Sequence, residues 1–222
     1  MKELHRVLGL LLLIPFLLWT ATGLLFLLKP GWASAYEMLD AFDPSPLDLG
    51  AVLAPGDALR QAGVAEPLQR LELGQTALGP LYRVRLREEG GAARLIDARS
   101  GRIVSPLTEE QARAIAAGAA SRANARERYG AVVESNGVED AVDVRFAGGA
   151  IVTVGRNDLN VSQRGLDTNR IDALYRIHYL QWTGHPSVDR ALAIVAIGGT
   201  WVLAILGGIL FLGPRPRGSA VR

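Results

Sequence analysis

The three histidines of this 222-residue chain are the residues whose type and placement best suit chemistry. All three lie beside long apolar runs: His5 precedes the first run, and His178 and His185 precede the second. Imidazole is a common metal ligand and an axial ligand of haem iron. We therefore treat all three as candidate cofactor-binding residues, with haem b as the candidate cofactor.

The spacing of the histidines limits how they would hold a haem. His178 and His185 are seven residues apart, which is about 10 Å along a continuous helix. Two axial nitrogens on one iron lie only about 4 Å apart. One straight helix therefore cannot supply both ligands, and a bis-histidine haem would need a second protomer or a partner subunit. The alternative is that all three histidines are polar anchors of the helix ends.

Other kinds of chemistry find little support. The chain has no cysteine, and residues 33–167 include no histidine, which argues against a thiol nucleophile, a thiolate metal site or a Ser-His-Asp hydrolase. The net charge is +2, so no nucleic-acid partner is expected. No glycine-rich phosphate-binding motif is present. The sequence does not decide whether the protein is an enzyme, and it favours a role that is not catalytic.

The apolar runs that flank the histidines, Val7–Leu28 and Ala191–Leu212, contain no charged residue. Each exceeds the roughly 20 residues that a helix needs to cross a bilayer. Basic residues lie outside both runs, at Lys2, Arg6, Arg215, Arg217 and Arg222. By the positive-inside rule, both termini face the cytoplasm and residues 33–187 lie across the membrane. The alternative for the first run is a cleaved signal peptide, although the apolar core of a signal is shorter, at about 7–15 residues.

Small residues recur at every fourth position of the second run, at Ala196, Thr200, Ala204 and Gly208. Such a row lets another helix approach closely in lipid. We expect it to pack against the first span, another membrane protein or the same helix of a homodimer. The alternative is that small residues are simply frequent in membrane spans.

Between the runs, the sequence predicts an α+β domain in two similar halves with antiparallel sheets. Alternating apolar and arginine residues, as in Tyr82–Arg87, are typical of half-buried strands. The first half is predicted to contain a short helix and three strands, at 54–62, 68–73, 81–86 and 93–96. The second half repeats this order, with predicted elements at 108–128, 131–134, 141–146 and 150–154. Hairpin turns are expected at Gly90-Gly91 and Gly148-Gly149, a turn with positive φ at Gly101, and a capping box at Thr108 and Gln111.

An amphipathic helix at the membrane interface is predicted from Thr168 to Thr183. Its apolar side carries Ile171, Leu174, Tyr175, His178 and Trp182. We expect Gly184 and Pro186 to end it and Ser187 to cap the second span.

Several segments, taken together, resemble the PepSY family and its associated membrane proteins. The first half has Tyr82-Arg83-Val84-Arg85-Leu86 followed by the Asp-x-x-x-Gly-x-Ile-Val pattern of 97–104. The first span has Leu4-His5-Arg6-Val7-Leu8-Gly9-Leu10, and Tyr175-Arg176-Ile177-His178-Tyr179-Leu180 precedes the second. The resemblance implies a bacterial inner-membrane protein with PepSY lobes in the periplasm. It also implies links to b-type haem reductases or, for soluble PepSY domains, to regulators of secreted proteases.

These observations give one architecture and three functional hypotheses. The expected order is a cytoplasmic N-terminus, a first span, two PepSY-like lobes, an interfacial helix with its loop, a second span and a cytoplasmic tail, at 1–6, 7–28, 33–107, 108–167, 168–186, 188–212 and 213–222. The first hypothesis is an accessory subunit of a redox or metal-uptake assembly, which shares haem through His5 or His178. The second is a membrane-tethered module that binds a periplasmic protein such as a protease. The third is a homodimeric b-type haem reductase.

Overall fold

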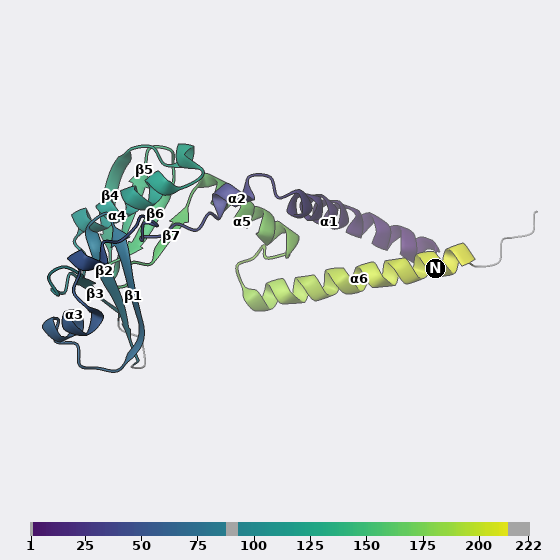
Figure 1. The fold of residues 1–222 in the computed structure, drawn as a ribbon. Helices are drawn as coiled ribbons and strands as arrows, with labels where there is room; N and C mark the ends of the chain where they lie inside the picture. The colour runs from purple at the N-terminus through teal and green to yellow at the C-terminus, as the bar shows by residue number, and fades with distance from the viewer. Residues whose placement is uncertain (1, 88–92, 213–222) are drawn as a thin grey trace, which may run out of the picture. The chain divides into compact units, whose positions relative to one another are not determined.

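The computed structural model describes residues 2–87 and 93–212, and its chain forms two compact units (Figure 1). One unit contains the chain up to Pro30 and the chain from Arg170 onward, and the other is Gly31–Asn169. The predicted Gly90-Gly91 turn and the basic residues Arg215, Arg217 and Arg222 lie outside the described residues.

The first unit is built on two long helices, α1 (Lys2–Leu28) and α6 (Pro186–Leu212), of 27 residues each. Both have an apolar window with a mean hydropathy of 2.3, of which 6% and 0% is buried within the structure. Because so little of this apolar surface is covered by protein, neither helix is a buried core helix of the described structure. Both are long and apolar enough to cross a membrane, which supports contact with a lipid bilayer.

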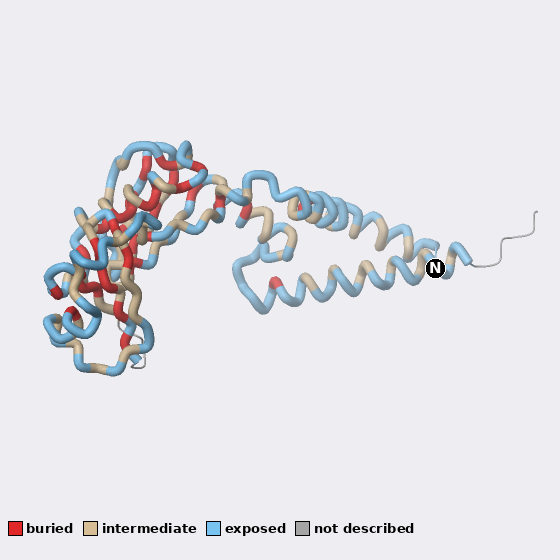
Figure 2. The backbone as a smooth tube through the Cα atoms, in the orientation of Figure 1, coloured by how far each residue is buried: buried red, intermediate tan, exposed pale blue. Residues whose placement is uncertain are grey.

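The two helices pack along a seam of small and partly buried residues. A β-carbon on Gly199 would lie 3.2 Å from Leu12, and one on Gly9 would lie 3.8 Å from Leu203. The partly buried positions of α6 include a row at alternating spacings of three and four residues, with Gly199 and Leu206 beside it: Ala193, Ala196, Thr200, Leu203, Gly207 and Leu210 (Figure 2). This spacing is typical of a left-handed helix pair.

The predicted row of small residues divides between two faces of α6. Ala196 and Thr200 are partly buried, whereas Ala204 and Gly208 are exposed. A strict four-residue repeat drifts around an α-helix by about 40° at each step, because four residues exceed one turn of 3.6. The seam with α1 therefore follows only the first half of the row.

A three-stranded antiparallel sheet begins the central unit, in the order β1 (Leu68–Thr76), β2 (Gly79–Leu86) and β3 (Ala93–Asp97). The predicted alternation along β2 is confirmed, since Tyr82, Val84 and Leu86 are buried against α3 (Pro55–Gln61) and its flanking loops. The Tyr82 hydroxyl donates to the carbonyl of Leu53 at 2.6 Å. The expected turn after β3 is also confirmed, with Gly101 at φ 66°.

A four-stranded antiparallel sheet follows, in the order of its sequence. Its strands are β4 (Val132–Val138), β5 (Ala141–Phe146), β6 (Ile151–Gly155) and β7 (Val161–Arg164). Helix α4 (Glu109–Arg122) covers it with alanines and Ile115, and it begins with the predicted capping box of Thr108 and Gln111. The Gly148-Gly149 turn between β5 and β6 is confirmed, with Gly149 at φ 90°.

Helix α4 ends at Arg122, so the prediction that it continues to residue 128 is wrong. The backbone becomes extended at Ala123, and the Glu37 carboxylate accepts the N–H groups of Asn124 and Ala125. A partner distant in sequence thus satisfies donors that another helical turn would have used. A short 3₁₀ helix, η2 (Arg126–Arg128), follows.

The two sheets share one hydrophobic core. Leu81 and Leu95 of the first sheet are fully buried in the same cluster as Ile115 of α4 and Val142 and Val144 of β5. The segment before the first sheet contributes Ala41 to this cluster. That segment includes the short helices α2 (Trp32–Ala35) and η1 (Leu49–Ala51).

Helix α5 (Leu166–His178) ends five residues before the predicted Thr183. The chain turns at Leu180, whose φ is 55°, and Trp182 lies beyond the helix. The Asp189 carboxylate accepts the N–H and hydroxyl of Thr183, at 2.9 and 2.8 Å. Helix α6 starts at Pro186, so Ser187 lies inside the helix and the prediction that it caps the second span is wrong.

Candidate functional site

His178, the last residue of α5, is held against α1 by a hydrogen bond from its ring. Its Nδ1 lies 2.9 Å from the Thr22 hydroxyl, and Gly23 leaves room for the ring, because a β-carbon there would lie 3.6 Å from its Cε1. The Thr22 hydroxyl also lies 2.8 and 3.0 Å from the carbonyls of Leu18 and Trp19, either of which can accept its one proton. When it donates there, it accepts from Nδ1–H of His178, and in that tautomer the lone pair of Nε2 is available to a ligand.

Aromatic rings fix the orientation of the His178 imidazole. Trp19 stacks on it at 5.7 Å between ring centroids, and Phe26 and Tyr179 meet it edge-on at 4.7 and 5.3 Å. Phe26 is itself stacked on Tyr175. An imidazole with one nitrogen hydrogen-bonded and its ring packed in this way is oriented as metal-ligating histidines are.

His178 lines an apolar pocket between α1 and α6 with a volume of about 360 Å³. This volume falls within the usual range of ligand sites. Pro15 of α1 lines the same pocket and has no N–H to give to the preceding turn. The other walls come from both helices and from the turn after α5: Leu12, Phe16, Trp19, Tyr179, Leu180, Ala193, Ala196, Ile197, Thr200 and Trp201. We call this space the His178 pocket.

The other two histidines lie outside the His178 pocket. His5 lies in the seam between α1 and α6, where a β-carbon on Gly207 would lie 3.2 Å from its Cε1. The Nδ1 of His5 is buried and has no hydrogen-bond partner in the described part of the chain. The side chain of His185 is exposed in the turn before α6. Within residues 2–87 and 93–212, none of the hydrogen bonds or ring contacts of the histidines joins two of them, and no three His, Cys, Asp or Glu residues form a metal-binding group.

The central unit carries a charged groove that sequence reasoning missed. Arg70, Glu72, Arg83 and Arg85 of the first sheet line a hollow of about 210 Å³, with Asp158 also in its wall. Glu72 pairs with Arg83 and Arg70. Burial raises the pKa of Glu72, but these two guanidinium groups more than offset this and hold the pKa below its ordinary value. The alternating arginines of β2 are the feature of the sequence from which this groove could have been predicted.

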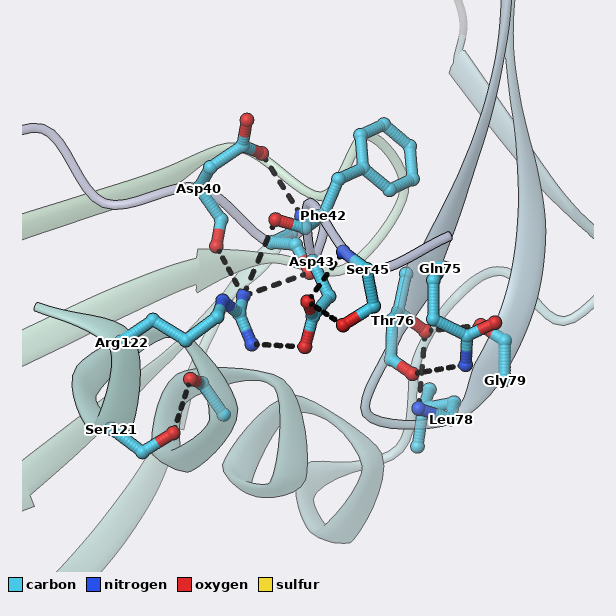
Figure 3. Close-up of polar contacts among 12 residues, drawn as sticks. Asp40, Phe42, Asp43, Ser45, Gln75, Thr76, Leu78, Gly79, Ser121 and Arg122 are labelled. Carbon is cyan, nitrogen blue, oxygen red and sulfur yellow. Dashed lines mark hydrogen bonds and ion pairs between the residues drawn. The ribbon is translucent and has the colours of Figure 1, made fainter. Parts of the chain in front are cut away.

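Arg122, at the end of α4, holds in place the segment that precedes β1 and includes Asp40 and Asp43 (Figure 3). Its guanidinium donates to the carbonyl of Asp40 at 2.9 Å and pairs with Asp43 at 3.5 Å. Asp43 also donates its N–H to the carbonyl of Gln75 in β1. Hydrogen bonds from the side chain and N–H of Ser45 lower the pKa of Asp43. The segment before β1 is therefore held by both α4 and the first sheet.

A second anchor, which we call the Arg128 cluster, joins the two ends of the central unit. Arg128 donates to the carbonyl of Ser34 at 2.6 Å, to the Gln163 side chain, and to Asp167 at 2.7 Å. Gln163 donates to the carbonyls of Ala35 and Glu37, and the Thr168 hydroxyl donates to Ala35. The chain thus enters and leaves this unit at one place.

Glu37 makes part of this anchoring dependent on pH. Burial raises its pKa, but hydrogen bonds from Asn124 and Ala125 outweigh this, so the pKa of Glu37 is lower than its ordinary value. Since the folded-state pKa is the lower one, the stabilisation is complete above the unfolded value of about 4.3 and is lost as the pH falls through the folded value.

We expect Glu37→Gln to lower the free energy of unfolding by about 1 kcal/mol at neutral pH, and the difference to disappear in acid. Thermal unfolding of the full chain in detergent at a series of pH values measures this. Glu127→Gln, at an exposed carboxylate, is the control. A difference for Glu37→Gln that stays constant with pH would contradict the assignment.

Comparison with models of protein families, with curated proteins and with solved structures finds no match for this chain. Its function must therefore be argued from its own geometry.

Proposed function

We propose that this protein is a two-span protein of the bacterial inner membrane, with both termini in the cytoplasm and the central domain in the periplasm. The exposed apolar surfaces of α1 and α6 support the membrane assignment, and the basic residues outside the two runs support the orientation. The PepSY-like motifs of the central domain include most of β2 and the end of β3 with the turn after it, which supports its membership of that family as part of this proposal.

Within this membrane setting, the protein acts as an accessory subunit of a redox or metal-uptake assembly. The observation that carries this is the orientation of His178 in an apolar pocket between two membrane-spanning helices. An ionisable side chain among membrane-spanning helices is costly to place there and usually marks a functional site. Ile197 and Trp201 in the wall of the His178 pocket are exposed, so a partner helix can cover this side of it.

The His178 pocket fits one half of a haem b site. His178 offers a single ring nitrogen, Thr22 holds the ring in place through Nδ1, and Trp19 and Phe16 supply apolar walls. When bound, haem supplies one-electron transfer. His178 would hold the haem through one ring nitrogen, and a second histidine ligand would have to come from another chain, because neither His5 nor His185 lines the pocket. This is why we propose that the protein is not catalytic alone.

The test is a reduced-minus-oxidised absorption spectrum of the assembly purified from native membranes through a tag on this chain. We expect a b-type band that His178→Ala removes and that His185→Ala, at an exposed histidine, leaves intact. An equal band per protein in His178→Ala would overturn the assignment of His178. A band in the isolated chain would support the homodimeric reductase instead, and an assembly without any band would rule out the haem.

The second candidate function is a tethered module that binds a periplasmic protein, and the edge of the four-stranded sheet favours it. Within the described residues β4 pairs only with β5, and its Val133 and Val138 are 63% and 53% exposed. An exposed strand edge of this kind can accept a strand from a partner. If this function holds, Val133→Lys should abolish copurification of the partner, whereas His178→Ala should not.

A further inference from the structure

A hollow with two arginines lies where α5 ends and α6 begins. It has a volume of about 460 Å³ and is lined by Arg176, Tyr179, Gln181, Asp189 and Arg190, among others. Arg176 lies in the last turn of α5 and Arg190 near the start of α6. The left-handed turn at Leu180 reverses the chain between them, so two guanidinium groups fourteen residues apart in sequence line one space.

The hollow carries more positive than negative charge. In the part of the chain that the structure describes, neither Arg176 nor Arg190 forms an ion pair. Asp189 is the one carboxylate in the wall and accepts the N–H and hydroxyl of Thr183, so the two arginines outnumber it. The hollow therefore keeps a positive charge that suits an anion. Arginine binds phosphate oxygens through two parallel hydrogen bonds.

The position of the hollow along α6 indicates which kind of molecule carries the anionic group. Arg190 is the last charged residue before the apolar run Ala191–Leu212. Tyr179 and Trp182 are exposed at the same end of the helices, and aromatic side chains of this kind favour the headgroup region. One turn further along α6, Ile194 and Val195 are exposed and offer an apolar surface to acyl chains.

We propose that Arg176 and Arg190 bind the phosphate of an anionic phospholipid, whose acyl chains lie along the exposed apolar face of α6. Basic hollows beside membrane helices are typical sites for anionic headgroups. This inference goes beyond the proposed function: it depends on the membrane setting and not on haem or on a partner subunit. The bound lipid would fix the depth of α6 and of the end of α5 that carries His178.

The experiment is native mass spectrometry of the delipidated full-length protein, mixed with equal amounts of phosphatidylglycerol and phosphatidylcholine in detergent. Wild type should retain phosphatidylglycerol preferentially, and each arginine removed should reduce the preference about fivefold. R176Q/R190Q should therefore bind the two lipids almost equally. Arg170→Gln removes the same charge from the exposed surface of α5 outside the hollow and should leave the preference unchanged.

Two further arms keep the test decisive. R176K/R190K keeps both charges and should keep most of the preference, which separates a lost site from a misfolded variant. An excess of inorganic phosphate should not displace the lipid, whereas displacement would show that the hollow takes free phosphate instead. An unchanged preference in correctly folded R176Q/R190Q, or a wild type without any preference, would overturn the proposal.

Discussion

Replacing Arg128 by alanine is expected to lower the free energy of unfolding of the central unit by about 3 kcal/mol. The Arg128 side chain is only 10% exposed. Its removal leaves the carbonyl of Ser34, the Gln163 amide oxygen and the Asp167 carboxylate without their common donor. Unpaired groups in such a setting cost about 1–3 kcal/mol each, and some regain water. The unfolding temperature should fall by about 10 °C.

Differential scanning calorimetry of the full chain in detergent measures this shift. Arg126→Ala is the matched control, because Arg126 lies in the same 3₁₀ helix and is exposed. Its effect should stay within about 0.5 kcal/mol. If Arg128→Ala shifts the transition no more than Arg126→Ala does, the Arg128 cluster is not what holds the two ends of the unit together.

Leu95→Ala should destabilise both sheets at once, at a cost of about 3 kcal/mol. Leu95 belongs to β3 of the first sheet, yet it is fully buried in the cluster that contains Val142 and Val144 of β5. Truncation of a buried leucine removes apolar contacts and leaves a cavity that the surroundings fill only in part. Since the sheets share this core, amide exchange should accelerate in β5 as well as in β2.

Hydrogen exchange of the full chain, followed by mass spectrometry, separates the two sheets. Leu49→Ala, at a leucine that is 70% exposed, serves as the control and should change exchange in neither sheet. If Leu95→Ala accelerates exchange in β2 but leaves β5 unchanged, the halves are independent lobes, and the shared core contributes little to stability.

Local signals in the sequence predicted most elements of the central unit. The capping box of Thr108 and Gln111, the alternation of Tyr82, Val84 and Leu86, and the glycine turns each depend on a few neighbouring residues, so they can be identified without the fold. Strand β7 was missed because it is four residues long and includes the polar Ser162 and Gln163. Only its pairing with β6 makes it a strand.

The candidate site was predictable only in part, because its decisive contacts are distant in sequence. The apolar runs of the sequence predicted that the three histidines lie beside long apolar helices. The partner of His178 is Thr22, 156 residues earlier, and no spacing rule connects them. The predicted end of α4 was wrong for the same reason: the Glu37 carboxylate, which accepts the N–H of Asn124, is 87 residues away in sequence. The two arginines of the α5–α6 hollow lie close together because the chain makes a left-handed turn at Leu180. Leucine rarely adopts a positive φ, so the sequence does not predict this turn.

The closeness of the two ends of the central unit also bears on how α1 and α6 find each other. If the chain between them were unfolded, pairing of the helices would have to close a loop of roughly 150 residues. Folding of the central unit brings Ser34 and Ala35 within hydrogen-bond distance of Gln163 and Thr168. The loop that remains, residues 29–34 and 168–185, is about sixfold shorter, which lowers the entropy cost of pairing by about 1.5 kcal/mol. The folded domain thus raises the effective concentration of one helix for the other.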